Sequence, residues 1–183
     1  MTSLHHLVYS ITPRDAVVKH TLALREVIMS LCFDSEIFSM FRHPDLISDT
    51  HYIDHLPADA DALIYQLSIG SPVAERWARH SALKIANYHN ITPISLVGKW
   101  DGLLAAEVQL GREQMARYAK VCDHAICDSD FKKSELVELG YASTKTIPVL
   151  FDLSQAAPDR PTLSRLQGNR QGTQVLFVGR VAP

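Results

Sequence analysis

The sequence is short of the features that mark several classes of protein. Its 183 residues contain no run of 18 apolar residues, the length that a membrane-spanning helix requires. Met1 to His6 lack the charged start and long apolar stretch of a secretory signal peptide. The formal net charge is only −2, and no stripe of Lys and Arg gives the footprint of a nucleic-acid-binding or membrane-surface protein. These absences predict a cytoplasmic protein that binds no nucleic acid.

Cysteine and glycine motifs are scarce as well. The cysteines Cys32, Cys122 and Cys127 are odd in number and lack the paired spacing of a metal site, so we expect reduced, buried thiols. No Gly-x-Gly-x-x-Gly or phosphate-loop lysine motif follows any apolar run, which disfavours a dinucleotide-dependent enzyme.

Acidic and histidine-containing stretches give no metal site in our interpretation. The aspartates of Asp59–Asp61 precede an expected strand and so lie at the wrong end of a parallel sheet, whereas those of Asp128–Asp130 are explained by helix capping. The histidines at positions 43, 51 and 55 lie in an irregular segment without the spacing of a closed site. We predict no metal and no cofactor.

What the sequence does contain is a repeated alternation of strand and helix patterns. Hydrophobic residues make up 46% and charged residues 21%, as in soluble globular domains, and the length suits one full domain but not two. Apolar runs of strand length are too continuous to face water, which indicates a parallel sheet with helices on both faces and hence a Rossmann-like α/β class. The runs are Leu7–Ile11, Glu36–Met40, Ala62–Ser68, Leu83–His89, His124–Asp128 and Lys145–Leu150.

Two expected helices share a start signal. Thr12 is placed to cap a helix with Pro13 at its first position, and Ser71 with Pro72 repeats this pattern. The first of these helices is expected to bury one face, which consists of Val17, Leu24, Ile28 and Leu31.

Two later segments are also helical in pattern. Ser129 is expected to cap a helix that Gly140 ends in a left-handed turn. Residues 101–121 form the other helical segment, in which Gly102 and Gly111 suggest one or two breaks.

The C-terminal part changes in character. We expect residues 1–152 to form the Rossmann-like domain and residues 153–172, rich in Pro, Gly, Gln and Arg, to form a linker. The apolar run Val175–Val178 within residues 173–183 then has no sheet of its own. It is expected to be the first strand of a second domain that is missing from the chain.

The strand ends indicate where a ligand would bind. In open parallel sheets, ligands bind outside the carboxyl ends of the strands. In "NYHN", His89 and Asn90 stand at such an end, so a protonatable side chain would face the crevice. A histidine that only hydrogen-bonds a neighbouring loop is the alternative.

Four ordered stretches carry a resemblance. They are "DAVVKHTLALREVIMSLCFDSEIFS", "ANYHNITP", "GREQMARYAKVCDHAICDSDFKKSELVELGY" and "VLFVGRVAP". Together they cover nearly the whole chain and resemble the N-terminal, acceptor-side half of a retaining glycosyltransferase of family 4. This family has the GT-B architecture, in which two Rossmann-like domains face each other across a cleft.

The resemblance implies roles for particular residues. His89 matches the family's histidine close to the donor sugar, while Gly179 and Arg180 match its Gly-Arg pair, whose arginine binds the donor pyrophosphate. A solvated turn arginine is the alternative for Arg180. The family's next lysine and its paired glutamates fall beyond the last residue of this sequence.

Other residues are expected to line the acceptor side of the cleft. These candidates are Thr12, Arg14, Asn90, Trp100 and Ser129. The family's glycine after the first strand is absent, because no residue from 10 to 19 is glycine, so Arg14 either supplies a charge there or is a surface residue. Trp77 and Trp100 are both expected to be packing residues rather than sugar platforms, and Trp100 is the one that could also line the cleft.

The resemblance implies that the complete protein moves a sugar from a nucleoside diphosphate sugar to a glycan or a lipid-linked acceptor with retention. Its partners would be these substrates and the missing C-terminal domain. Contact with the inner face of the membrane stays open. We expect residues 1–183 alone to have negligible transferase activity. The alternatives are a non-catalytic remnant or partner-docking module, and half of a GT-B sugar epimerase.

Overall fold

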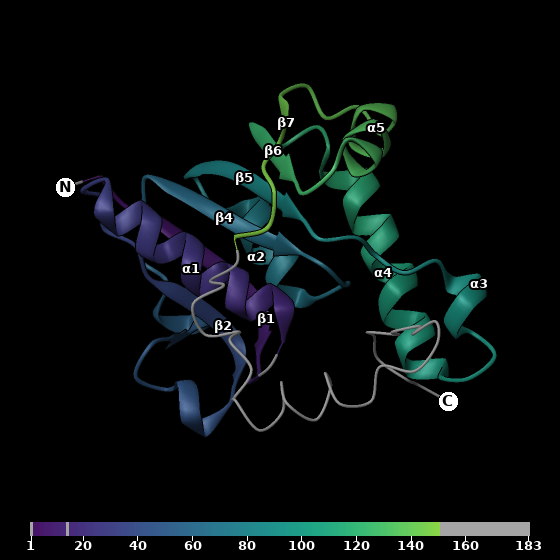
Figure 1. Cartoon of the computed structure of the whole chain (residues 1–183), viewed down its shortest axis with the longest axis horizontal. Helices are drawn as coiled ribbons and strands as arrows, with labels where there is room; N and C mark the ends of the chain where they lie inside the picture. The colour runs from purple at the N-terminus through teal and green to yellow at the C-terminus, as the bar shows by residue number, and fades with distance from the viewer. Residues whose placement is uncertain (1, 14, 151–183) are drawn as a thin grey trace, which may run out of the picture. The chain divides into compact units, whose positions relative to one another are not determined.

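A computed structural model gives the fold, and it describes residues 2–13 and 15–150. Within these residues, seven strands form one sheet in the order β3-β2-β1-β4-β5-β6-β7, and every neighbouring pair is parallel (Figure 1). The predicted Rossmann-like α/β class is confirmed. The strands are β1 (Leu4–Ile11), β2 (Ile37–Arg42), β3 (His51–Tyr52), β4 (Ala62–Leu67), β5 (Leu83–Tyr88), β6 (His124–Cys127) and β7 (Thr144–Thr146).

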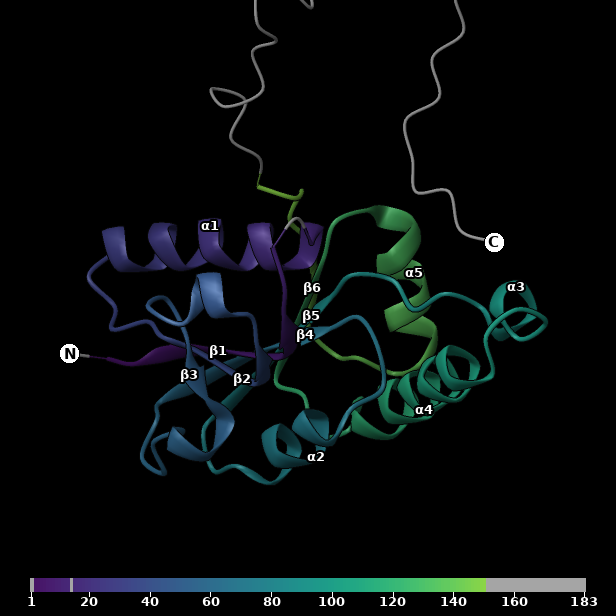
Figure 2. The same cartoon turned by 90° about the horizontal axis from the view of Figure 1, so that it is seen from below.

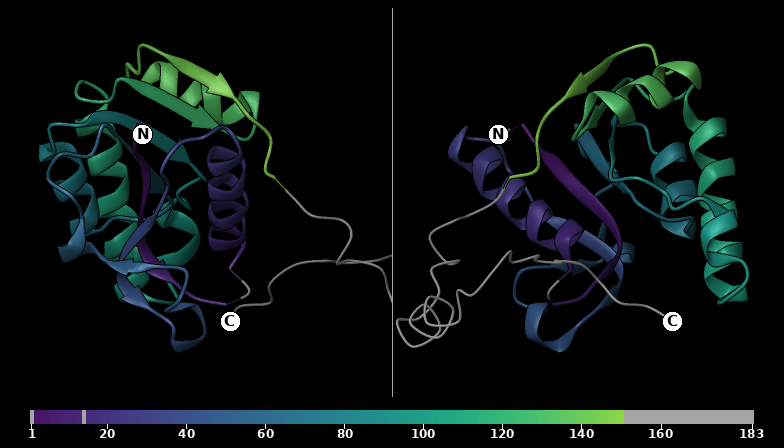
Figure 3. Two further views of the ribbon diagram at one scale, coloured as in Figure 1. Left: turned by 90° about the vertical axis from the view of Figure 1, so that its left-hand side faces the viewer. Right: turned by 45° about the vertical axis from the view of Figure 1, so that its right-hand side comes forward.

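Helices cover both faces of the sheet. Figure 2 shows α1 on one side of the strands and α2 and α4 on the other, and both views of Figure 3 agree. Two short 3₁₀ turns, η1 (Pro44–Leu46) and η2 (Ile53–His55), flank β3. The helices are α1 (Ala16–Ser30), α2 (Pro72–Arg79), α3 (Ile94–Val97), α4 (Gly102–Tyr118) and α5 (Asp130–Glu138).

The strand order creates a switch point beside β1. After β1 the chain builds β2 and β3 on one side, and it then returns to place β4 on the other side. The connections therefore leave the carboxyl ends of β1 and β4 in opposite directions. In open α/β sheets a crevice forms at this place.

Two of the strand predictions differ from the structure. The two-residue strand β3 was not predicted, because "HY" is too short to give a period-two pattern. The last predicted strand, Lys145–Leu150, is reduced to Thr144–Thr146. Pro148 has no N–H to donate to a ladder, which explains why pairing stops before it.

Of the two predicted cap-then-proline starts, Thr12–Pro13 is wrong, and Ser71–Pro72 is right in position but without the capping hydrogen bond. Asp15, not Thr12, caps α1: its Oδ1 accepts from the backbone N–H of Val17 at 2.7 Å and of the next residue at 3.3 Å. Ser71 does precede α2 with Pro72 at the first position, but its hydroxyl lies 3.0 Å from the Tyr65 hydroxyl instead of capping. Pairing with this buried phenol replaces capping.

The buried face of α1 also differs from the prediction. The helix ends at Ser30, so Leu31 lies beyond it and is 65% exposed. Of the predicted face, Ile28 is buried, and the remaining buried positions hold Val18, His20 and Thr21. Two polar residues thus replace part of the expected apolar stripe.

The glycine in the middle of α4 does not break the helix. Residues 102–118 are continuously helical, and Gly111 packs against Gly70 after β4. A Cβ on Gly111 would lie 2.6 Å from the Gly70 backbone nitrogen, which itself donates to the Glu107 carbonyl at 3.0 Å. The close approach of two backbones therefore explains Gly111.

The predicted start and end of α5 are confirmed. Ser129 stands at the N-cap, where its hydroxyl accepts from the Lys132 backbone N–H at 3.5 Å. Gly140 follows the helix with a φ of 93°, a left-handed conformation that glycine adopts without strain.

The cysteine prediction holds only in part. Cys32, Cys122 and Cys127 are all free thiols, but Cys32 is exposed, and only Cys127 is fully buried. Cys32 lies in the turn after α1, where its backbone adopts a left-handed φ of 65°.

Several predictions lie outside the described residues. They concern Arg14, the linker 153–172, the strand Val175–Val178, and Gly179 with Arg180. In the part of the chain that the structure describes, no helix combines the length and apolarity that crossing a bilayer requires.

Candidate functional site

The switch point between β1 and β4 opens into a hollow. Its volume is about 320 Å³, and its polar lining comes from the end of β1 (Ser10), the start of α1 (Asp15) and the residue after β4 (Ser68). Val8, Tyr9, Val17 and Ile69 complete the lining. The hollow therefore lies where the fold predicts a ligand.

His89 follows β5 at the same edge of the sheet. Its Nε2 lies 2.6 Å from the Oε1 of Gln66 in β4, and the Asn87 Nδ2 donates to the same oxygen at 2.9 Å. The Gln66 Nε2 lies 3.2 Å from the Nδ1 of His6 in β1. His89 is thus tied to the two strands of the switch point and not to a neighbouring loop.

A third histidine packs against this group from α1. The His20 ring meets the His89 ring edge to face, with 5.4 Å between centroids. The backbone N–H of Leu150 donates to His20 Nδ1 at 3.1 Å, which places the His20 proton on Nε2. His6 and His89 therefore both lie within hydrogen-bond distance of Gln66, and His20 packs against the ring of His89.

Burial keeps these histidines neutral. Burial, and then the nearby His20, lower the pKa of His6 to about 3. Burial together with His20 and Lys132 lowers the pKa of His89 to about 3, although Asp128 acts in the opposite direction. Burial also lowers the pKa of His20, again against Asp128. At neutral pH the site therefore presents uncharged imidazoles.

An ion pair stands beside His89. Asp128 follows β6, and its Oδ2 accepts from Lys132 Nζ in the first turn of α5 at 2.7 Å. Burial favours the neutral acid, but the hydrogen bond and charge of Lys132 outweigh it and lower the pKa of Asp128. The pair supplies both signs of charge next to a neutral histidine.

The other predicted residues are scattered along this edge. Asn90 is exposed with a φ of 78°, and its Oδ1 lies 3.4 Å from the Tyr88 hydroxyl. Thr12 lines a separate hollow of about 210 Å³ with Arg42 and His43. Trp100, in the turn between α3 and α4, is 72% exposed. Ser129 serves α5 as its cap.

Sequence reasoning missed most of the partners of His89. They are His6, His20, Gln66, Asn87, Asp128 and Lys132. One signal was visible: Gln66 and Asn87 interrupt apolar strand runs, and they are register partners in neighbouring strands. A polar residue inside a buried strand needs a partner, so such positions predict a buried network.

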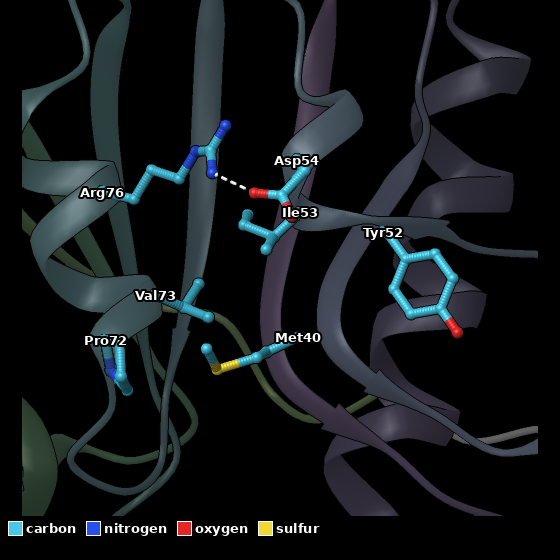
Figure 4. A pocket seen from close by; sticks show the side chains of 7 residues that line it. All are labelled: Met40, Tyr52, Ile53, Asp54, Pro72, Val73 and Arg76. Atoms are coloured by element: carbon cyan, nitrogen blue, oxygen red, sulfur yellow. Dashed lines mark hydrogen bonds and ion pairs between the residues drawn. The ribbon is translucent and has the colours of Figure 1, made fainter.

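A second hollow lies between η2 and α2. Its volume is about 350 Å³, and Figure 4 shows the side chains of Met40, Ile53 and Val73 converging in it. At its rim Arg76 pairs with Asp54 at 2.7 Å. Apolar walls and an already paired charge give this hollow no reactive group.

The predicted absence of a metal remains a prediction. Within residues 2–13 and 15–150, no three His, Cys, Asp or Glu side chains gather in a group suited to a metal ion. Comparison of the chain with protein-family models and with curated proteins found no match. Only the site geometry and the resemblance in sequence therefore point to a function.

Proposed function

We propose that this chain forms the acceptor-side half of a retaining GT-B glycosyltransferase that uses a nucleoside diphosphate sugar. One observation carries the proposal: His89, a neutral imidazole, is held at the carboxyl end of β5 by Gln66, at the edge where the switch-point hollow opens. This is the place and the side chain that the resemblance to family 4 predicts.

Sugar transfer with retention requires the two substrates to be held in position, and it does not require a strong base. The bond from the anomeric carbon to the diphosphate oxygen breaks, the bond from that carbon to the acceptor oxygen forms, and the acceptor's proton passes to the departing diphosphate. Rate comes from holding the two substrates and stabilising the leaving charge. A neutral His89 orients a sugar hydroxyl without placing a charge beside it.

The test uses the full-length protein that the complete reading frame encodes. Release of nucleoside diphosphate is measured over a panel of nucleotide sugars, with and without a mixture of glycan and lipid-linked acceptors. We expect release that depends on the acceptor. His89→Ala should lower kcat/KM roughly 100-fold. His55→Ala, which changes an exposed histidine on η2, is the control and should leave it unchanged.

Two outcomes would contradict the proposal. A folded protein that releases no diphosphate from any donor would support the non-catalytic docking module. Release that needs no acceptor, together with a changed sugar configuration, would support the epimerase.

A further inference from the structure

A line of buried hydrogen bonds crosses the sheet on the α1 side and ends at His89. It runs from His6 through Gln66 to His89, and Asn87 joins it at Gln66. His6 is 0% exposed and Gln66 is 1% exposed. His89 is only partly buried, so one end of the line is enclosed and the other reaches the edge of the sheet.

The distances define which atoms donate. The 2.6 Å contact between His89 Nε2 and Gln66 fits an N–H donating to an oxygen, whereas two nitrogens would not approach so closely. The same oxygen lies 2.9 Å from the Asn87 amide nitrogen. The Gln66 amide nitrogen therefore faces His6 and donates to Nδ1 across 3.2 Å. His6 must then carry its proton on Nε2.

This arrangement leaves one donor unsatisfied. In the part of the chain that the structure describes, His6 Nε2 is the one enclosed side-chain nitrogen or oxygen without a hydrogen-bond partner. Burying an unpaired donor destabilises a protein, and an apolar side chain would fill this place without that cost. The unpaired Nε2–H lowers stability, but the same tautomer leaves His6 Nδ1 free to accept a hydrogen bond from Gln66.

We infer that Gln66 and His6 are positioning residues that hold His89 as the Nε2–H tautomer, so that its Nδ1 is a hydrogen-bond acceptor at the edge of the sheet. Nδ1 is not among the fully enclosed, unpaired side-chain atoms of the described residues, and His89 itself is only partly buried. A lone pair needs a donor, which a hydroxyl supplies and a phosphate oxygen does not. Where His89 belongs to the proposed transferase site, it therefore selects a sugar hydroxyl and not the diphosphate.

The test reads the tautomer directly. The 183-residue chain is labelled with ¹⁵N-histidine, and long-range proton–nitrogen correlation spectra are recorded at pH 7.5. His89→Asn identifies the His89 signals by their loss. We expect an unprotonated Nδ1 and a protonated Nε2 for His89. Gln66→Leu should replace this single tautomer by an averaged pair of signals. Gln109→Leu, on the exposed side of α4, should change nothing.

Two results would overturn the inference. One is a wild-type His89 that is protonated on Nδ1 or averaged between tautomers; the other is a Gln66→Leu variant that keeps the wild-type pattern. The wild-type spectrum decides the first point even if the variant fails to fold. Neither measurement involves a nucleotide sugar, so the inference and the proposed transferase activity fail separately.

Discussion

The two faces of the sheet are both buried, but by different chemistry. The face toward α2 and α4 is apolar and aromatic, with Trp77, Tyr65 and Tyr88 among its fully buried side chains. The face toward α1 has a small apolar cluster, formed by Val8, Ile11, Val18 and Ile37. Beside that cluster it buries the polar side chains His6, His20, Gln66 and Asn87.

This difference indicates that the two faces of the sheet have different roles. Strands of a parallel sheet that is covered on both sides are usually apolar throughout, because burying polar groups costs free energy. The α2 and α4 face follows this rule more closely and supplies stability, and its buried polar residues Ser71 and Gln114 lie at the start of α2 and in α4, where the Gln114 side chain is hydrogen-bonded to the Ser71 backbone. The α1 face departs from it along a line that ends at His89, the candidate functional residue. The departure therefore coincides with the place where we propose the functional site.

The largest expected effect is the response of the α1 face to acid. His6 and His89 have pKa values lowered from 6.5 to about 3, so they stay neutral in the folded protein and take up protons on unfolding. The unfolded chain then binds more protons, and stability falls as the pH drops from 6.5 toward 3. Between pH 7.5 and 4.5 we expect the free energy of unfolding to fall by roughly 5 kcal/mol for the two together.

Urea denaturation at a series of pH values measures this loss. In His6→Gln the average slope between pH 6.5 and 4.5 should decrease by about 1.2 kcal/mol per pH unit, because one histidine no longer titrates. His55→Gln, at an exposed position, is the matched control. An unchanged slope in His6→Gln would show that the α1 face does not respond to acid through this histidine.

The next largest effect tests the apolar face. Trp77 is 1% exposed, packs against the rings of Tyr65 and Tyr118, and donates to the Leu63 carbonyl at 3.2 Å. Trp77→Ala should lower the free energy of unfolding by about 3–5 kcal/mol through the cavity that it leaves. Trp100→Ala removes a tryptophan that is 72% exposed and should change stability by less than about 0.5 kcal/mol. If both variants lost the same free energy of unfolding, the α2 and α4 face would not be the main source of stability.

These two faces also show how far the sequence predicts the structure. The strands give clear signals, since largely apolar runs such as Ala62–Ser68 predict buried parallel strands, and such runs predict six of the seven strands in the described residues. Ser129 and Gly140 were likewise readable, because the cap and the left-handed turn depend on residues close in sequence.

The polar line could not be predicted in the same way. His6, Gln66 and His89 meet only because the register of three parallel strands brings them together. Local sequence patterns give wrong predictions where contacts between residues far apart in the sequence decide the structure. Gly111 looked like a helix break but serves a backbone contact with Gly70, and the Ser71 hydroxyl, expected to cap a helix, pairs with Tyr65.

A smaller effect concerns the packing of α4 onto the end of β4. Gly111→Ala places a Cβ 2.6 Å from the Gly70 nitrogen and 3.1 Å from the Ile69 backbone carbon, so the helix must move away. We expect a loss of about 1–3 kcal/mol in thermal or urea unfolding. Gly102→Ala has nothing within 4 Å of its Cβ and should be neutral or slightly stabilising. A neutral Gly111→Ala would mean that the apolar face tolerates a shift of its main helix.

The smallest expected effect separates structure from function at Asp15. This residue caps α1, the helix that covers the polar face, and it also lines the switch-point hollow. Asp15→Ala should cost about 1 kcal/mol because two backbone N–H groups lose their acceptor. Asp15→Asn keeps a capping oxygen, so it should lower the free energy of unfolding by only about 0.3 kcal/mol. Urea unfolding measures both variants. An Asp15→Ala variant with unchanged stability would show that the capping bonds of the carboxylate do not stabilise α1.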